Sequence, residues 1–189
     1  MSLKRSGLAL GLLLLIGTYG DPVLATHDYV LEIHKSQRTL LLRHGGKVEK
    51  KYFIAHGQGG RGDKEHFGDR KTPIGTYKIV KIKDHSRFHS FFHLNYPNVK
   101  DAFFGLRDKL ISEGDFDRIV SSAKHLEVPP QNTRLGGAIG IHGIGEETAE
   151  QMKIHGNLNW TKGCIALTNA QIDDLKKYIG LGTKVVITE

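Results

Sequence analysis

Cys164 and His142 are the residues whose types and spacing best fit a chemical role. Cys164 is the only cysteine of the 189-residue sequence. A thiol is a useful nucleophile only as the thiolate, so it needs a neighbouring base or cation, and His142 is a candidate for that base. Gly140, Gly143 and Gly163 flank the two residues, where glycine allows close backbone approach and leaves peptide N–H groups free to face an oxyanion. The arrangement is typical of a cysteine acyl-transfer site.

The residues around these positions resemble the L,D-transpeptidases of the YkuD or ErfK type, cysteine enzymes that remodel bacterial peptidoglycan. That family combines His-Gly or His-Ser with a later Ser/Thr-His-Gly-Cys and a small apolar run, which His142, Thr161, Gly163 and Cys164 match. Lys162 stands where histidine is more common. A second family stretch, Gly-Asp-x-Lys/Arg-Thr-Pro-x-Gly-x-Tyr, is matched over residues 68–77. Two motifs in family order are more specific than one.

The resemblance implies a role for each site residue. Cys164 is the nucleophile, and His142, oriented by the carbonyl of Gly143, takes the thiol proton and returns it to the leaving amine. The N–H groups of Gly163 and Cys164 are the candidate oxyanion hole. Expected substrate-binding residues are Tyr96, Asn159, Trp160, Thr161 and Lys162. The implied substrate is a peptidoglycan tetrapeptide stem, cleaved between its diamino acid and its terminal D-alanine, and we expect no cofactor and no metal.

Three functions remain compatible with these residues. In a transpeptidase an amine resolves the thioester; in a hydrolase of the same bond type water resolves it, giving an L,D-carboxypeptidase or an amidase that releases wall-linked protein. The third function is a non-catalytic wall-binding domain, against which the retention of Cys164 and His142 counts. Ala166 stands where many transpeptidases have an arginine placed for the substrate carboxylate, and the surrounding residues are closer to the branch with wall-associated amidases. Transfer and hydrolysis therefore both stay open.

Two other residues near Cys164 have alternative interpretations. His155 is a competing base that is nearer in sequence, but it lies in an expected loop, whereas residues 139–142 alternate like a strand that can hold an imidazole rigidly. We therefore favour His142. Lys162 would share a face with Cys164 if both lay on one strand. It would then stabilise the thiolate or contact the wall, and a solvated lysine is the alternative.

The N-terminus predicts a secretory signal peptide at residues 1–25. Lys4 and Arg5 form a basic region, residues 8–16 an apolar region, and residues 23–25 a small-residue cleavage site. The apolar run is short for a membrane span, although a retained anchor is the alternative. We therefore expect an exported protein of the periplasm or cell envelope, with no stable membrane insertion after cleavage. In an oxidising compartment the single cysteine has no internal disulfide partner.

The chain is basic. Its formal net charge is +7, and removal of Lys4, Arg5 and Asp21 with the signal leaves +6. Such a surplus favours polyanions. Because no nucleic-acid module is recognisable, we expect no nucleic-acid partner. Peptidoglycan stem peptides, anionic wall polymer and a wall-linked protein are the expected partners, and a merely solvated surface is the alternative.

Hydrophobic patterning predicts one mainly β domain over residues 26–189. Residues 29–55 read as three strands joined by turns at 36–37 and 44–47, and further strands are expected at 74–79, 139–142 and 183–188. With the resemblance, this implies a mainly β fold, an antiparallel β-sandwich or barrel-like L,D-transpeptidase catalytic domain with a small helical insertion and a C-terminal helix.

Two helical segments interrupt the strands. Residues 101–126 show helical spacing, with Ser112 as a cap, and form either a candidate lid or a helix that closes one end of the sheet. Asn169 is expected to cap a helix that ends at Gly180. His85, His89 and His93 would stack on a helix and invite zinc, but the residues around them read as extended, so we predict no metal site there.

Overall fold

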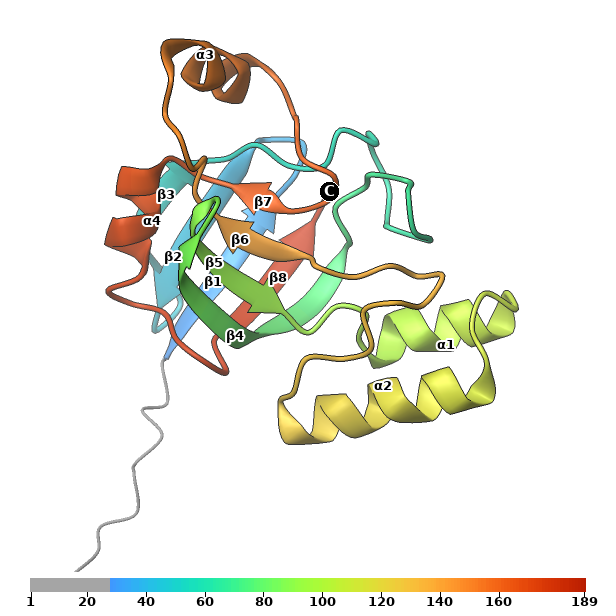
Figure 1. Cartoon of the computed structure of the whole chain (residues 1–189). Coiled ribbons are helices and arrows are strands. Elements are labelled where there is room, and N and C mark those ends of the chain that lie inside the picture. Colours follow the sequence, from blue (N-terminus) through green and yellow to red (C-terminus); the bar gives the residue numbers. More distant parts are fainter. Residues whose placement is uncertain (1–27) are drawn as a thin grey trace, which may run out of the picture.

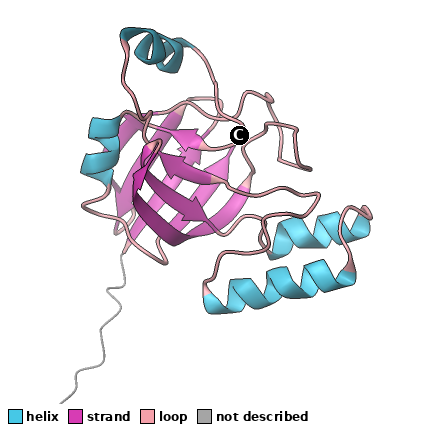
Figure 2. Cartoon of the chain, in the orientation of Figure 1, coloured by secondary structure: helices cyan, strands magenta, loops and turns pink. Residues whose placement is uncertain are grey.

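Eight strands of one curved sheet form the centre of the molecule, and helices lie around its margins (Figure 1; Figure 2). The computed structural model describes residues 28–189, so the predicted signal peptide lies outside the described residues. The strands are β1 (Tyr29–His34), β2 (Thr39–His44), β3 (Lys47–Phe53), β4 (Gly75–Ser86), β5 (His89–Leu94), β6 (Gly140–His142), β7 (Ile165–Ala166) and β8 (Lys184–Thr188). Their order across the sheet is β3-β2-β1-β8-β4-β5-β6-β7.

Apolar side chains on one face of each strand pack together into a common core. In β1, for example, Leu31 and Ile33 are fully buried while the residues between them are partly exposed, as the period of two requires. Each of the eight strands contributes at least one such residue to the core. The helix α4 (Asn169–Leu175) adds Ile172 and Leu175 to it. The strands next to the two sequence motifs are therefore packed into one core.

The first three strands confirm the predicted meander. β1, β2 and β3 pair antiparallel, and Gly45 and Gly46 make the second turn with φ of 54° and 81°, a backbone conformation that suits glycine. The mainly β fold is likewise confirmed. Two pairings are parallel, however, β1 with β8 and β6 with β7, so the sheet is mixed rather than antiparallel. Alternation of side chains reveals a strand's faces but not the direction of its neighbour.

The sheet stays open, but its two edges are joined by a few hydrogen bonds. Beyond β3, Ala55 exchanges N–H···O bonds of 3.0 and 2.8 Å with Ala166 of β7. One residue further on, the carbonyl of His56 accepts from the N–H of Thr161 at 3.2 Å. The barrel-like expectation is therefore right only in this local sense: the segment after β3 meets the strand that follows Cys164.

The helical insertion forms a hairpin with a small core of its own. Its helices are α1 (Val99–Arg107) and α2 (Glu113–His125). The predicted cap is confirmed, because Ser112 Oγ accepts from the Asp115 N–H at 3.1 Å and the Asp115 carboxylate accepts from the Ser112 N–H at 3.3 Å. Ala102, Ile111, Ile119 and Leu135 form this second core. The hairpin lies to one side of the sheet (Figure 1).

A helix that the sequence did not predict, α3 (Ala149–Asn157), occupies the chain between His142 and Cys164. The loop expected around His155 is therefore wrong, because Thr148 caps a short helix there. The helix stands off the sheet in Figure 1. Arg38 holds its C-terminal end by hydrogen bonds. The Arg38 guanidinium donates to the carbonyls of Ile54, His155, Gly156 and Leu158 at 2.8–3.3 Å.

The C-terminal helix differs from the prediction at both ends. Thr168, not Asn169, is its N-cap, since Thr168 Oγ1 accepts from the Gln171 N–H and the Gln171 side chain bonds back to the Thr168 N–H. The helix ends at Leu175 rather than near Gly180. The Asn169 side chain instead bonds to the N–H and C=O of Gly145, in the loop after β6.

The three spaced histidines lie on strands, as the extended pattern predicted. His85 is in β4, whereas His89 and His93 are in β5. Within residues 28–189, no helix has both the length and the apolar character needed to cross a bilayer.

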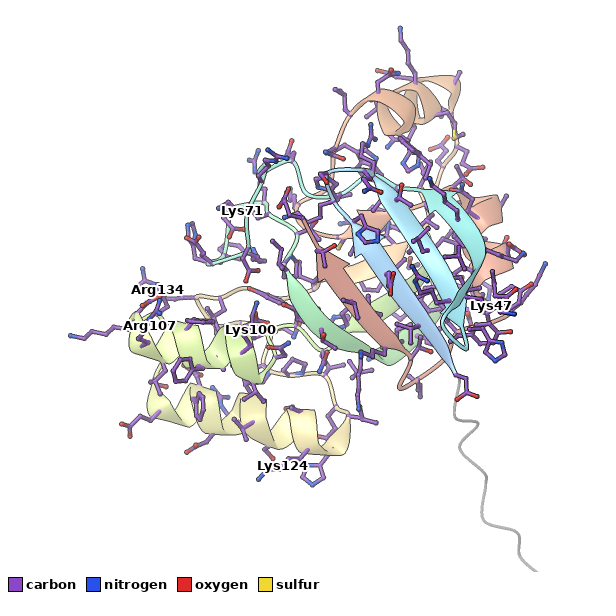
Figure 3. The ribbon with its side chains drawn as sticks, turned by 180° about the vertical axis from the view of Figure 1, so that it is seen from behind. Lys47, Lys71, Lys100, Arg107, Lys124 and Arg134 are labelled. Carbon is purple, nitrogen blue, oxygen red and sulfur yellow. The ribbon has the colours of Figure 1, made fainter. Side chains whose placement is uncertain are left out.

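Cationic side chains are distributed over several elements. Figure 3 shows Lys47 of β3 far from Arg107 of α1 and from Arg134 in the loop after α2. Several cations are also paired, such as Lys100 with Asp63 at 2.6 Å. This distribution fits a solvated basic surface better than one polyanion-binding patch.

The close approach of β5 to Gly140 generates a stability prediction. A Cβ at Gly140 would lie 2.5 Å from the Phe91 ring and 2.6 Å from the Phe92 carbonyl oxygen, so Gly140→Ala should lower the free energy of unfolding by about 1–3 kcal/mol. At Gly156, in α3, a Cβ would have no heavy atom within 4 Å, so Gly156→Ala is the matched control and should stabilise by about 0.5–1 kcal/mol. Urea denaturation measures both; equal midpoints for the two variants would contradict the packing argument.

Candidate active site

A cleft of about 580 Å³ contains the predicted nucleophile and the predicted base. Its wall combines aromatic rings, the backbone of residues 136–139 and basic side chains. The lining residues are Lys64, Phe67, Gly68, Arg70, Arg87, Phe88, Phe91, Gly136, Gly137, Ala138, Ile139, His142, Trp160, Thr161, Lys162 and Cys164. Residues from separate parts of the sequence therefore meet in one depression.

Parallel pairing of β6 with β7 brings His142 and Cys164 together. Ile141 pairs with Ile165 and His142 with Ala166, so Cys164 lies immediately before β7 and alongside Gly140. The Gly140 N–H faces the sulfur and favours its anionic form. The side chains of Ile141 and Ile165 are fully buried in the main core, which fixes both strands. Since side chains alternate along a strand, His142 projects to the face opposite Ile141, into the cleft.

The imidazole of His142 is held in one orientation. Its Nδ1–H donates to the carbonyl oxygen of Gly143 at 2.6 Å, which leaves Nε2 as the proton acceptor. Gly143 is confined as well, because a Cβ there would lie 2.5 Å from Asn169 Oδ1 and 2.9 Å from the Phe88 carbonyl oxygen. The Gly143 N–H donates to Ser90 O at 3.3 Å. The predicted orienting carbonyl is thus in contact with His142.

Three aromatic rings surround this imidazole. Phe88 stacks on it with 4.4 Å between centroids, and Phe91 stacks with 5.7 Å between centroids and 7° between planes. Trp160 meets it edge-on at 6.0 Å. The His142 side chain is consequently 2% exposed. These walls fix the ring plane and remove water from it.

A tight turn presents Cys164. Gly163 has a φ of 130°, and a Cβ there would lie 2.8 Å from Lys71 O and 2.9 Å from Ile139 Cδ1, so only glycine fits. Thr161 closes the turn from within: its hydroxyl donates to the Cys164 carbonyl at 2.6 Å and accepts from the Gly163 N–H at 3.2 Å. The cysteine is partly exposed at the end of this turn.

The turn also affects the predicted oxyanion hole. The Gly163 N–H is engaged by Thr161 Oγ1, which corrects its expected role as a free donor. No acceptor for the Cys164 N–H is found among the described residues. Cys164 therefore keeps the free donor, and Gly163 serves the shape of the turn.

Burial makes the two reactive groups electrically neutral at pH 7. Desolvation raises the pKa of the Cys164 thiol to about 11, and the Gly140 N–H and the charge of Lys64 only partly oppose this. Desolvation, assisted by the charges of Arg87 and His155, lowers the pKa of His142 to about 4 despite the bond to Gly143. The thiol also donates to the Ala138 carbonyl at 3.2 Å. Both shifts favour a thiol beside a neutral imidazole over a thiolate–imidazolium pair in the free protein.

The second sequence motif, residues 68–77, is connected by hydrogen bonds to the turn that carries Cys164. Thr72 is fully buried, and its hydroxyl accepts from the Gly57 N–H at 2.8 Å. A Cβ at Gly57 would lie 2.3 Å from the Arg70 carbonyl oxygen, so glycine is needed for this approach. The Gln58 N–H then donates to Thr161 O at 3.0 Å. The two motifs are thus joined through residues 57–58.

His155 has a supporting position rather than a place in the cleft. It is 3% exposed in α3, and its Nδ1 accepts from the Trp160 indole N–H at 3.4 Å, while its Nε2 has no partner among the described residues. Trp160 in turn contacts His142. His142 therefore lines the cleft that contains Cys164, whereas His155 does not.

The predicted substrate-binding residues divide into two groups. Trp160, Thr161 and Lys162 line the cleft, although Lys162 and Cys164 lie in a turn rather than on one strand. Tyr96 does not line it: the ring is fully buried and its hydroxyl donates to Leu135 O at 3.0 Å. Asn159 is also elsewhere, where its Oδ1 accepts from the His56 N–H at 3.2 Å.

Sequence reasoning missed the residues that enclose His142 from β4 and β5. Arg87 and Phe88 lie in the turn between these strands, and Phe91 pairs with His142 across β5 and β6. No motif marks them, because their role follows from strand register. The α1–α2 hairpin supplies none of the cleft's lining residues, so the lid hypothesis gains no support from contacts.

No group of three or more potential metal ligands is found within residues 28–189.

Comparison with known proteins agrees with this geometry. The family model YkuD, described as the L,D-transpeptidase catalytic domain, matches residues 28–187. YafK of Escherichia coli strain K12, which carries an L,D-transpeptidase designation, is 33% identical over 104 residues, covering 51% of this chain and 42% of YafK. The chain thus spans less than half the length of this curated relative.

Solved structures show the same fold. The helical cell shape determining protein Pgp2 of Campylobacter jejuni matches with a TM-score of 0.52 and 23% identity, over 86% of this chain and 48% of Pgp2. Bd1075 of Bdellovibrio bacteriovorus matches with a TM-score of 0.51 and 23% identity, over 85% and 48%. With a family match over nearly all of the described residues, the chain belongs to the YkuD family of L,D-transpeptidase catalytic domains.

Proposed function

We propose that the protein is an exported cysteine L,D-transpeptidase that acts on peptidoglycan stem peptides through a thioester on Cys164. The observation that carries this proposal is the pairing of Cys164 with a fixed His142 in one cleft. Family membership supports the reaction class, and the signal-like residues 1–25 support export to the periplasm or cell envelope.

The first half-reaction forms the thioester. Because the thiol is neutral and donates to Ala138 O, it turns to His142 Nε2 as the substrate enters, and Nε2 removes its proton while sulfur bonds to the carbonyl carbon. The Cys164 N–H stabilises the oxyanion. His142 then gives the proton to the leaving amine of D-alanine as the C–N bond breaks.

The second half-reaction releases the acyl group. An acceptor amine attacks the thioester, His142 takes a proton from it, and the C–S bond breaks to restore the thiol. Water in place of the amine gives hydrolysis by the same site. The choice depends on which nucleophile enters the cleft.

Mass spectrometry of tetrapeptide fragments incubated with residues 26–189 tests the reaction. We expect amine-exchanged or cross-linked products with the unaltered protein and none with Cys164→Ala. Cys164→Ser controls for binding, because it keeps size and polarity. Shortened stems alone would establish a hydrolase, and unchanged fragments with every variant would refute the proposal.

The identity of the base has its own prediction. His142→Gln should lower turnover by about 10²–10⁴, the range for loss of a general base. His155→Gln should stay within about tenfold, since the glutamine oxygen can still accept the Trp160 indole N–H. Steady-state kinetics on the same fragments measures both variants. The reverse ranking would make His155 the base.

The neutral thiol predicts a pH dependence without any substrate. With the pKa of Cys164 near 11 and that of His142 near 4, iodoacetamide alkylation should accelerate about tenfold per pH unit above neutrality. Timed alkylation followed by intact-protein mass measures the rate, and Cys164→Ala is the blank. A plateau from roughly pH 5 to 8 would instead reveal a preformed thiolate–imidazolium pair and contradict the general-base mechanism.

A further inference from the structure

The catalytic cleft carries positive charge that nothing in its lining neutralises. Among its described lining residues are four basic side chains, Lys64, Arg70, Arg87 and Lys162, and none is Asp or Glu. The neighbouring cavity of about 460 Å³, between the 63–66 loop and α1, is instead lined by residues of both signs. A cleft with one sign of charge and apolar walls attracts ligands of the opposite sign. The charge of the cleft therefore suits a ligand with an anionic group.

Arg87 is the cation best placed to meet that group. Lys64 is buried and already paired with Asp69 at 2.7 Å. The Arg87 guanidinium has no hydrogen-bond or ion-pair partner in the part of the chain that the structure describes, and its Cζ lies 4.5 Å from the centroid of the Phe88 ring. Arginine presents a planar fork of donors that matches a carboxylate.

The turn that carries Arg87 is anchored on both sides. The Phe88 N–H donates to Ser86 Oγ at 3.0 Å. From the loop after β6, Gly145 packs so closely that a Cβ there would lie 2.4 Å from the Arg87 carbonyl oxygen. The Asn169 side chain holds Gly145 through two hydrogen bonds. The guanidinium thus projects from a fixed backbone next to the base.

Phe88 lies between Arg87 and the catalytic base. The guanidinium contacts this ring and His142 stacks on it at 4.4 Å, so cation, phenyl ring and imidazole form one stack. The other titratable groups near His142 are His155 from α3 and Cys164 before β7, with Arg70 and Lys162 elsewhere in the lining. Arg87 reaches the imidazole through this stack, and its positive charge opposes protonation of the ring.

On the function proposed above, we propose that Arg87 binds a carboxylate of the stem peptide, and that this ion pair makes His142 a stronger base only in the loaded enzyme. A carboxylate on the guanidinium cancels the charge that disfavours imidazolium. Proton transfer from Cys164 then becomes easier at the moment when a correct substrate is present. Recognition and activation are thus coupled through one residue.

Paired peptides test the recognition step. The probes are a tetrapeptide stem with free carboxylates and two analogues, one amidated at the terminal carboxyl and one at the diamino-acid side-chain carboxyl. With the unaltered protein, kcat/KM should fall about 10–100-fold for one analogue, the range for a charged hydrogen bond. Arg87→Gln should lower kcat/KM for the free peptide by a similar factor, so that the free and amidated peptides react at the same rate. Arg87→Lys should restore part of the difference in kcat/KM between them. Arg134→Gln, an exposed arginine that does not line the cleft, is the matched control and should keep the full difference between the peptides.

Nuclear magnetic resonance tests the coupling step without turnover. In the free protein, Arg87→Gln should raise the pKa of His142, and in Cys164→Ala saturated with peptide the free-carboxylate ligand should raise it more than its amidated analogue. Circular dichroism checks that each variant is folded. If the unaltered protein turned over all three peptides at equal rates, this inference alone would be overturned. An unchanged pKa of His142 in Arg87→Gln would overturn it as well. Absence of turnover and binding for every stem peptide would overturn the proposed function with it.

Discussion

The parallel pairing of β6 with β7 is the constraint on which the site depends. It joins two short strands separated by more than twenty residues, and its register places His142 opposite Ala166 and Cys164 beside Gly140. A one-residue shift of β7 would turn Cys164 toward the core and Ile165 away from it, and the same shift of β6 would do this to His142 and Ile141. The buried Ile141 and Ile165 therefore protect the geometry, because exposing either would lose about 1.5–3 kcal/mol of apolar burial.

Enclosure of the imidazole gives the site its chemical character. The rings of Phe88, Phe91 and Trp160 remove water from His142, and the bond to Gly143 leaves only Nε2 to act. A desolvated, neutral imidazole takes up protons from bulk water only weakly. On the proposed mechanism its Nε2 is nevertheless oriented to accept the proton of Cys164 when substrate binds. Desolvation also raises the pKa of Cys164, which slows oxidation of the thiol because the thiolate is the reactive form.

Much of this arrangement was predictable from sequence, for identifiable reasons. Strands with alternating apolar residues, such as β1 and β2, and the Ser112 cap depend on local patterns and were found correctly. The two family motifs located Cys164 and His142. The parallel partners of β7 and β8 were missed because alternation carries no information on strand direction. Tyr96 was predicted from the likeness of residues 94–98 to a stretch near the substrate groove of relatives, and such a likeness does not say whether the ring faces the cleft or, as here, the core. Arg87 was invisible because only the β4–β5 turn brings it to His142.

The segment between His142 and Cys164 is held at both ends by hydrogen bonds. The Asn169 side chain bonds to Gly145 at one end. At the other end, Arg38 donates to carbonyls at the end of α3 and to the carbonyl of Ile54 after β3. The length of this segment therefore has little effect on the relative position of His142 and Cys164. The entropic cost of closing a longer loop is small, because it grows by only about 0.6 kcal/mol per doubling of loop length. Residues 146–154 can vary, lengthen or carry a recognition segment while the spacing of His142 and Cys164 is set elsewhere.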